Sequence, residues 1–381
     1  MKGTKTMITD SFDNQSKAII EPFVNENAPE VDACIVTFSD KIEQTVLQNY
    51  NCTQIGEFNC ATRSTPVYLL EHNGQRFAFF KTMIGAPACV GTIEDSLAVI
   101  RTKRYIVFGG AGCLDKEIAH GKVMVPTAAY RDEGTSYHYA PAANYITVRN
   151  HQAVARFMEI SGIPFVKGLT WTTDAFYRET ENNFKKRKAN GCISVEMECA
   201  ALQAMCDFRG LELYTFFASG DLLDAPEWDK RHEDGELEGT QHNAGHFDIA
   251  LGLAEFISGL AMDKVLTMND WWDGPLLGLC TFGSEYCVFE RVFSEEKDDY
   301  TNDYYLTTVD ENAAQEIISD YHQWCEFMNN GGNADDWKSA VDIVNIAKSS
   351  PRYRKITRYA LFKGNFTSCS DEIKDYFVQW C

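Results

Sequence analysis

The stretch SVEMECAAL at residues 194–202 has the pattern of a buried helix that starts with two acids. Apolar side chains recur there at helical spacing and predict a helix over residues 195–207 with one stripe facing the core. The residues of that stripe are Val195, Cys199, Leu202 and Met205. Glu196 and Glu198 flank Met197 at the expected helix start, where the helix dipole favours carboxylates.

Apolar strands and helical stretches alternate on both sides of residues 194–202. Strands are predicted at 33–38, 76–84, 104–110, 120–130 and 211–219, and helices at 40–50, 92–102 and 245–261. Alternation on this scale predicts a layered α/β fold.

The character of the chain changes near Met262. Residues 265–381 contain five of the seven tryptophans, and their acids outnumber their bases by ten. Strand-like runs at 286–293 and 304–309 precede a helical run at 313–328. We therefore expect an N-terminal arm over residues 1–30, a catalytic domain over 31–264, and a smaller acidic, Trp-rich α+β domain of unknown role over 265–381.

The overall composition excludes several classes of function. The 381 residues carry a net charge of −20, which opposes binding to nucleic acid polymers or anionic membranes. The start shows no signal-peptide pattern and no apolar run reaches 18 residues, so we expect a cytoplasmic protein. The thirteen cysteines include no Cys-x-x-Cys pair and are expected to be reduced, and the scattered histidines indicate no metal site.

Two glycine-rich turns and two mixed loops follow predicted strands. IGAPA (84–88) and GGAGCL (109–114) are typical of tight turns, or of backbone that approaches an anion or a sugar. The loops are RDEGTSYHYAP (131–141) and TWTTDAFYRET (170–180). In the second loop Phe176 and Tyr177 could stack a heterocycle, although a packing role explains them equally well.

A polar break interrupts the strand near residue 219. FFASGDLLD (216–224) places Ser219 and Asp221 where a strand of an α/β sheet ends, which is where ligands usually bind. A desolvated Asp221 would have a raised pKa and could act as a general acid. The alternative is an aspartate that caps the next turn.

Taken in order, these segments resemble the nucleoside phosphorylase family, which includes purine nucleoside phosphorylase, uridine phosphorylase and the methylthioadenosine nucleosidases. The resemblance covers roughly residues 30–262. It implies a mixed, strongly curved sheet (a pseudo-barrel) surrounded by helices, and assembly as a homodimer or a hexamer built from dimers.

The resemblance also implies roles for individual residues. Glu198 matches the ribose-binding glutamate and Met197 the residue that packs beneath the sugar, with Glu196 completing the substrate-binding motif. Phe176 matches the base-stacking aromatic residue. Asp221 resembles the acid that protonates the leaving purine, although the additional Gly220 leaves Asp224 as an alternative.

The phosphate end of the site departs from the family pattern. The family's first glycine–arginine pair falls on Phe38 and Ile42, its second arginine on Val107, and its threonine on Gly110, which we retain as a substrate-binding position with Ser219. Only Arg63 matches, as the arginine that the family lends from the neighbouring subunit.

Three other cations are candidates to replace the missing phosphate arginines, namely Lys41, Lys81 and Arg131. The uracil-reading glutamine and arginine of uridine phosphorylases fall on Thr180 and Asn182. Because this uracil signature is missing, the sequence favours a purine base.

The sequence leads to a ranked set of functions. The first is a purine nucleoside phosphorylase, a pentosyltransferase of purine salvage that uses phosphate as co-substrate and needs no cofactor. The second is a nucleosidase in which Asp40 or Glu43 activates water. The third is a nucleoside-binding sensor without turnover, with residues 265–381 as its output.

Overall fold

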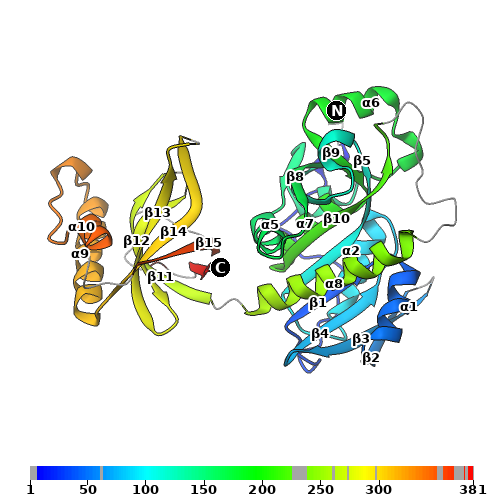
Figure 1. Cartoon of the computed structure of the whole chain (residues 1–381), viewed down its shortest axis with the longest axis horizontal. Coiled ribbons are helices and arrows are strands. Elements are labelled where there is room, and N and C mark those ends of the chain that lie inside the picture. The colour runs from blue at the N-terminus through cyan, green and yellow to red at the C-terminus, as the bar shows by residue number, and fades with distance from the viewer. Residues whose placement is uncertain are drawn as a thin grey trace. The chain divides into compact units, whose positions relative to one another are not determined.

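The computed structural model forms two compact units, which divide between Ser258 and Gly259. It describes residues 7–60, 63–224, 238–259, 262–272, 274–296, 298–349, 355–363, 373 and 376–380. The composition of the sequence predicts the boundary between the two domains six residues later, between residues 264 and 265. Each unit is described by itself (Figure 1).

The first unit is built on one mixed sheet of ten strands. These strands are β1 (Ala33–Thr37), β2 (Cys52–Asn59), β3 (Ser64–His72), β4 (Gln75–Lys81), β5 (Arg104–Cys113), β6 (Val123–Asp132), β7 (Tyr145–Thr147), β8 (Phe165–Thr173), β9 (Cys192–Glu196) and β10 (Glu212–Leu222). Their order is β10-β6-β8-β9-β5-β1-β4-β3-β2, and β7 pairs with β6. Because β10 also pairs with β5, five of the strands close into a ring.

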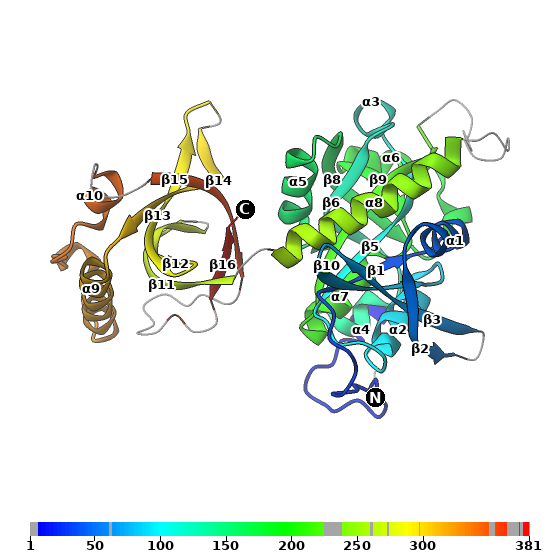
Figure 2. The ribbon, with the colours of Figure 1, turned by 60° about the horizontal axis from the view of Figure 1, so that its bottom comes forward.

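Helices cover this sheet (Figures 1 and 2). They are α1 (Asp40–Asn49), α2 (Ala86–Ser96), α3 (Lys116–Ala119), α4 (Ser136–Tyr139), α5 (His151–Ile160), α6 (Glu181–Ala189), α7 (Cys199–Arg209) and α8 (Glu238–Gly259), with short 3-10 turns η1 (Ile8–Asp10) and η2 (Phe176–Arg178). A mixed, barrel-like sheet surrounded by helices confirms the predicted fold class.

Parallel strands bring their carboxyl ends to one edge of the first unit. β1 runs parallel to β4 and β5, and β5 runs parallel to β10. All five residues of β1 are buried, which is typical of a strand covered on both faces. The loops that follow these strands therefore meet at the edge where α/β sheets bind ligands.

The second unit contains a closed six-stranded barrel in place of a layered sheet. Its strands are β11 (Met262–Trp271), β12 (Pro275–Phe282), β13 (Glu285–Ser294), β14 (Asp299–Val309), β15 (Lys355–Lys363) and β16 (Phe377–Trp380). Its helices are α9 (Glu311–Asn329) and α10 (Ile343–Lys348), with the 3-10 turn η3 (Ala334–Asp336). Figure 2 shows the strands forming a ring, and both views show the β13–β14 hairpin extending beyond it.

Apolar side chains fill the interior of the barrel. Phe289 lies at its centre and its ring packs against those of Tyr304, Phe362 and Trp380. Trp380 is 6% exposed, so this tryptophan belongs to the core. The α+β character expected of residues 265–381 is confirmed, while closure of the strands into a barrel was not predicted.

Three helix predictions need correction. The helix expected over 195–207 is a strand that ends at Glu196, followed by α7 from Cys199. The helix expected over 92–102 is α2, which begins at Ala86 and ends at Ser96. Gly85 at positive φ and a proline in the first turn start α2 early, as glycine and proline commonly do. The helix expected over 245–261 begins at Glu238.

Candidate functional site

The Glu-Met-Glu segment forms the junction between β9 and α7. Glu196 is the last residue of β9 and Glu198 is the N-cap residue of α7, with Met197 half-buried between them. β9 pairs with β8 on one side and with the end of β5 on the other. The fold thus places two acids at the start of a buried helix and next to the carboxyl end of the central strand.

Glu196 is bound on both of its carboxylate oxygens. One oxygen accepts from the hydroxyls of Thr172 (2.5 Å) and Thr170 (3.3 Å). The other accepts from the backbone N–H groups of Glu198 (2.8 Å) and Cys199 (2.7 Å). Burial raises the pKa of Glu196, and these four donors oppose that shift. Glu196 therefore positions the junction, and its direct contact with a substrate stays a prediction.

Glu198 is also buried, but its carboxylate accepts fewer hydrogen bonds than that of Glu196. Its Oε1 accepts from the backbone N–H of Gly85 at 2.6 Å, and the residue is 9% exposed. Burial and the negative charge of Glu196 raise the pKa of Glu198 to about 8, with a smaller contribution from Asp174. A pKa of about 8 means that the Glu198 carboxyl is mostly protonated at neutral pH. It therefore retains hydrogen-bonding capacity for another group.

Gly110 and Ser219 lie on neighbouring strands at the same edge. In the β5–β10 register Gly110 pairs with Ala218, and Ala111 pairs with Ser219. A Cβ added to Gly110 would meet nothing within 4 Å, so open space borders the backbone there. The buried hydroxyl of Ser219 has no hydrogen-bond partner. The edge thus combines backbone that borders open space with a buried hydroxyl that has no partner.

Asp221 lies against the β5–β9 pair. One of its carboxylate oxygens is 3.3 Å from the position that a Cβ on Gly112 would take, and Val195 contacts the same position. Because Val195 directly precedes Glu196, Asp221 lies close to the β9–α7 junction. The geometry therefore brings the predicted acid and the predicted ribose motif to one part of the sheet edge.

Sequence reasoning missed Glu179, which lies just after η2. Burial and the negative charge of Asp221 raise the pKa of the Glu179 carboxyl to about 7. The Glu179 carboxyl is therefore partly protonated near neutral pH. The only signal in the sequence was an acid inside the quoted loop at 170–180, which periodicity does not distinguish from a surface residue.

The structure bears on the choice between Asp221 and Asp224. The Asp224 carboxylate accepts from Lys188 Nζ at 2.7 Å and from the backbone N–H of Lys116 at 3.1 Å. Burial raises its pKa, but these two partners outweigh burial and the net shift is downward. An aspartate held ionised in this way is a poor proton donor, so Asp221 is the better candidate for the general acid.

Phe176 and Tyr177 project from η2 at the surface. Their exposed fractions are 50% and 85%, and their ring centroids are 4.1 Å apart. The packing role that the sequence allowed for them therefore does not apply. Exposed aromatic faces next to Glu179 remain available to a flat base.

At the phosphate end of the site, one lysine forms ion pairs with two carboxylates. Lys81 Nζ forms ion pairs with Asp40 and, at 3.1 Å, with Glu43. Burial lowers the pKa of Lys81, but both carboxylates raise it and the net shift is upward. Arg63 donates to the backbone carbonyl of Lys81 of its own chain at 3.3 Å. Two carboxylates thus neutralise the lysine that could have met a phosphate.

Apolar side chains occupy the remaining phosphate positions. Ile42 and Val107 are buried, and the Phe38 ring lies 3.0 Å from the position that a Cβ on Gly109 would take. Arg131, a proposed substitute cation, is 4% exposed and donates to Ser136 and to the carbonyls of Ala140 and Pro141. It therefore holds its own loop together. Lys41 is exposed on α1.

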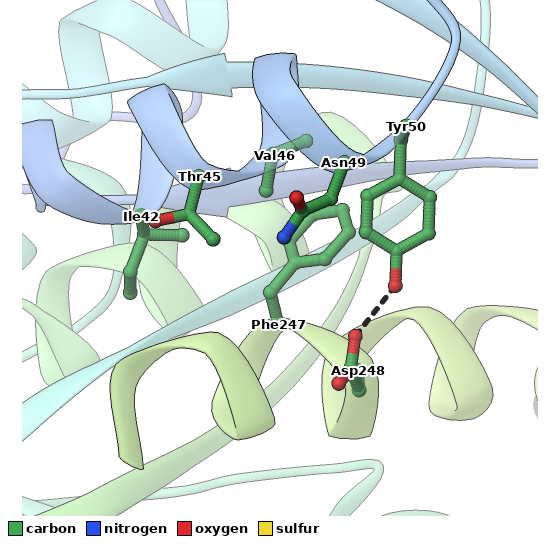
Figure 3. Close-up of a pocket in the computed structure, with 7 residues that line it drawn as sticks. All are labelled: Ile42, Thr45, Val46, Asn49, Tyr50, Phe247 and Asp248. Atoms are coloured by element: carbon green, nitrogen blue, oxygen red, sulfur yellow. Dashed lines mark hydrogen bonds between the residues drawn. The ribbon is translucent and has the colours of Figure 1, made fainter. Parts of the chain in front are cut away.

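A separate pocket of about 320 Å³ lies between α1 and α8 (Figure 3). Its lining residues are Ile42, Thr45, Val46, Asn49, Tyr50, Phe247 and Asp248. The Tyr50 hydroxyl donates to Asp248 at 2.5 Å and joins the two helices. The pocket shares Ile42 with the phosphate positions of the family and includes none of the predicted catalytic or substrate-binding residues.

Metal-binding groups and membrane-spanning helices are absent from the described part of the chain. No group of three or more His, Cys, Asp or Glu side chains within it could hold a metal ion. The eleven cysteines that the structure describes are free thiols. No helix among these residues is long and apolar enough to cross a membrane.

Comparisons with known proteins show which proteins the chain resembles. A uridine phosphorylase of Haemophilus influenzae is 28% identical over 172 residues, which are 41% of this chain and 68% of that protein. A DeoD-type purine nucleoside phosphorylase of an Exiguobacterium species is 26% identical over 158 residues, 40% of this chain and 65% of that protein. The alignments thus span about two thirds of these relatives.

A solved structure and a family model complete the comparison. The AMP nucleosidase of Bacteroides thetaiotaomicron is 17% identical, with a TM-score of 0.47 over 60% of this chain and 88% of that one. The model of the phosphorylase superfamily matches residues 32–250, which is more than half of the chain and ends before the second unit. The chain therefore belongs to the phosphorylase superfamily.

Proposed function

We propose that this protein cleaves the N-glycosidic bond of a purine nucleoside and that water is the attacking group. The observation that carries the glycosidic part is the buried Glu198, which accepts from the N–H of Gly85 and whose pKa is raised to about 8. A carboxyl with spare hydrogen-bonding capacity at the sheet edge suits the two hydroxyls of a ribose. When ionised, it supports the positive charge that develops on the sugar ring.

The choice of water rests on the charges at the other end of the site. Lys81 is neutralised by Asp40 and Glu43, and the family's arginine positions carry Ile42 and Val107. A phosphate dianion needs charged donors, and bidentate arginine contacts are the strongest of these. Water needs only a base, and carboxylates supply one. We therefore rank hydrolysis above phosphorolysis, reversing the order that the sequence favoured.

The proposed reaction is balanced with groups of this chain. The bond between the anomeric carbon and the base nitrogen breaks, and its electron pair leaves with the base. Asp221, next to Glu179, gives a proton to the leaving base. A water oxygen bonds to the anomeric carbon, and Glu43, whose side chain is 16% exposed, takes the water proton. The products are a free base and ribose.

Phosphorolysis is kept as the second candidate because of Arg63. Its guanidinium lies beside Lys81, and its charge contributes to the lowered pKa of Asp40, after the larger effects of Lys81. The family lends the matching arginine from a neighbouring subunit, whereas Arg63 lies beside Lys81 of its own chain. A place in purine salvage and assembly as a homodimer or hexamer remain predictions.

The test is a panel of inosine, guanosine, adenosine and uridine assayed in ¹⁸O-labelled water with and without phosphate. Hydrolysis predicts phosphate-independent release of purine base and ribose labelled at the anomeric oxygen. Phosphate-dependent release of ribose 1-phosphate would replace this proposal with the second candidate. Absence of cleavage, with a nucleoside raising the melting temperature, would support the sensor predicted as the third function.

Two variants test the site itself. Glu198→Ala should abolish cleavage of every nucleoside in the panel. Glu71→Ala is the control, because that carboxyl lies on β3 and is 74% exposed. An unchanged rate in Glu198→Ala would refute the assignment of the ribose site.

A further inference from the structure

Two turns meet at one end of the barrel of the second unit. One joins β11 to β12 and includes Trp272, and the other joins β13 to β14. Because Leu277 pairs with Glu290, the residues just before Leu277 lie beside those just after Glu290. Both turns therefore lie at the same end of the barrel.

This end of the barrel exposes four large aromatic side chains. Trp272 is 75% exposed, Phe293 47%, Trp271 43% and Tyr300 37%. We call these four residues the aromatic end. Single exposed aromatics are common, but a group of them at one end of a soluble unit marks an interaction surface. Trp380, in contrast, is packed inside the same barrel.

Arg291 lies between the two turns and is bonded to the strand that follows one of them. Its Nε donates to the carbonyl of Thr301 at 2.6 Å, and its guanidinium lies 5.7 Å from the centre of the Tyr300 ring. Its Nη1 is 3.2 Å from the position that a Cβ on Gly274 would take. The Phe293 and Tyr300 rings pack edge to face with centroids 5.2 Å apart. The aromatic end is thus pre-organised, and its arginine is already engaged.

Acidic residues follow Phe293 and precede Tyr300 in the sequence of the β13–β14 hairpin. The β13–β14 turn carries Glu295, Glu296, Asp298 and Asp299 against a single lysine in its sequence. All four acids are exposed. Exposed aromatic faces beside carboxylates attract organic cations, through the ring quadrupole and through charge. The same charge repels nucleic acid and anionic lipid.

We propose that the aromatic end is a docking surface for a basic, partly apolar peptide segment of another protein. Lysine or arginine side chains of the partner stack on Trp272 and pair with the acids of the β13–β14 turn. Its apolar side chains cover Phe293 and Tyr300. This role is independent of the glycosidic reaction of the first unit.

Fluorescence anisotropy with the full-length protein tests this proposal. The probe is a fluorescein-labelled twelve-residue peptide in which lysine and arginine alternate with leucine and phenylalanine. A second peptide has glutamate at every basic position, and a third has glycine and serine at every apolar position. We expect the first peptide to bind most tightly, the third more weakly and the second not at all. Salt should weaken the binding.

Variants connect the binding to the aromatic end. Trp272→Ala should raise the Kd about 5-fold, as a partly desolvated cation–π contact requires. Glu295→Lys combined with Glu296→Lys should raise it further and reduce its salt dependence. The controls are Phe208→Ala, at a 44% exposed site of the first unit, and Asp335→Lys in η3. Neither control should change the Kd.

Three results would overturn the proposal. One is equal affinity for the glutamate peptide, or an unchanged Kd in Trp272→Ala. Another is a Trp272-dependent change in the oligomeric state of the free protein by sedimentation, which would make the aromatic end a contact between copies of this chain. The third is displacement of the peptide by cellohexaose without salt dependence, which would indicate a sugar platform.

Discussion

Replacing Glu198 by glutamine should stabilise the first unit, and the gain should increase with pH. Glu198 is 9% exposed, and burial together with the charge of Glu196 raises its pKa from 4.5 to about 8. Glutamine keeps an oxygen that can accept from the N–H of Gly85. The substitution therefore removes the titrating group and preserves its one strong hydrogen bond.

The sign and the size follow from proton linkage. Between pH 4.5 and 8 the unfolded chain has lost the Glu198 proton, whereas the folded chain keeps it. The folded state then binds more protons, so its stability falls as pH rises, by about 1.4 kcal/mol per pH unit. At pH 7 the group has cost about 3 kcal/mol relative to pH 4.5, and the cost levels off above pH 8.

The assay compares wild type and Glu198→Gln in urea at pH 5, 6, 7 and 8. Hydrogen exchange of peptides from β9 and α7 reports on the first unit alone, which avoids the overlapping unfolding of the second unit. The stability difference should increase by about 3 kcal/mol or more between pH 5 and pH 8. Glu71→Gln is the matched control, because that carboxyl is 74% exposed and carries little burial cost.

A constant difference between pH 5 and pH 8 would refute this reasoning. It would mean that Glu198 is ionised in the folded protein throughout that range. The same substitution should lower kcat/KM about 100-fold or more, because a neutral amide cannot support a cationic transition state. A buried acid that destabilises the fold and serves the reaction is the expected trade between stability and function.

Three further perturbations separate chemistry from structure. Glu179→Gln should remove the ionisation near pH 7 from the pH profile of kcat/KM, since burial and the charge of Asp221 set that pKa. An unaltered profile would exclude Glu179 from the reaction. Asp224→Asn should lower the free energy of unfolding by about 1 kcal/mol in urea titrations and keep activity. Asp221→Asn should instead lose activity at unchanged stability. The reverse result would exchange the roles of these two aspartates. Gly278→Ala places a Cβ 2.3 Å from the carbonyl oxygen of Thr267. Calorimetry should therefore show a loss of stability of about 2 kcal/mol or more in the second unit only. An unchanged unfolding transition would contradict the barrel packing.

The strands of the first unit could be predicted because buried parallel strands are continuous apolar runs. The predicted runs at 33–38 and 104–110 correspond to β1 and β5, which pair in the middle of the sheet. The closure of the sheet could not be predicted. It depends on β10 pairing with both β5 and β6, and no local pattern records which strands meet across the chain.

The β9–α7 junction shows why part of the site was misplaced. The sequence predicts one helix over residues 195–207, because acids are common in a first turn and apolar residues continue beyond them. In the structure Glu196 ends a strand, and its carboxylate binds Thr170 and Thr172 from β8. These partners lie more than twenty residues earlier in the chain. The motif was therefore found, but its backbone conformation depended on tertiary contacts.

The charges around the proposed site affect both the stability of the transition state and the choice of nucleophile. The transition state of glycosidic cleavage is cationic, so the pair Asp40 and Glu43 favours it electrostatically, and Glu198 does so in its ionised form. The same carboxylates repel a phosphate dianion, and Lys81 is balanced by the two acids that bind it. Arg63 alone would have to hold the dianion against them. A neutral water molecule meets no such repulsion, so the same charges favour both the proposed transition state and the proposed nucleophile.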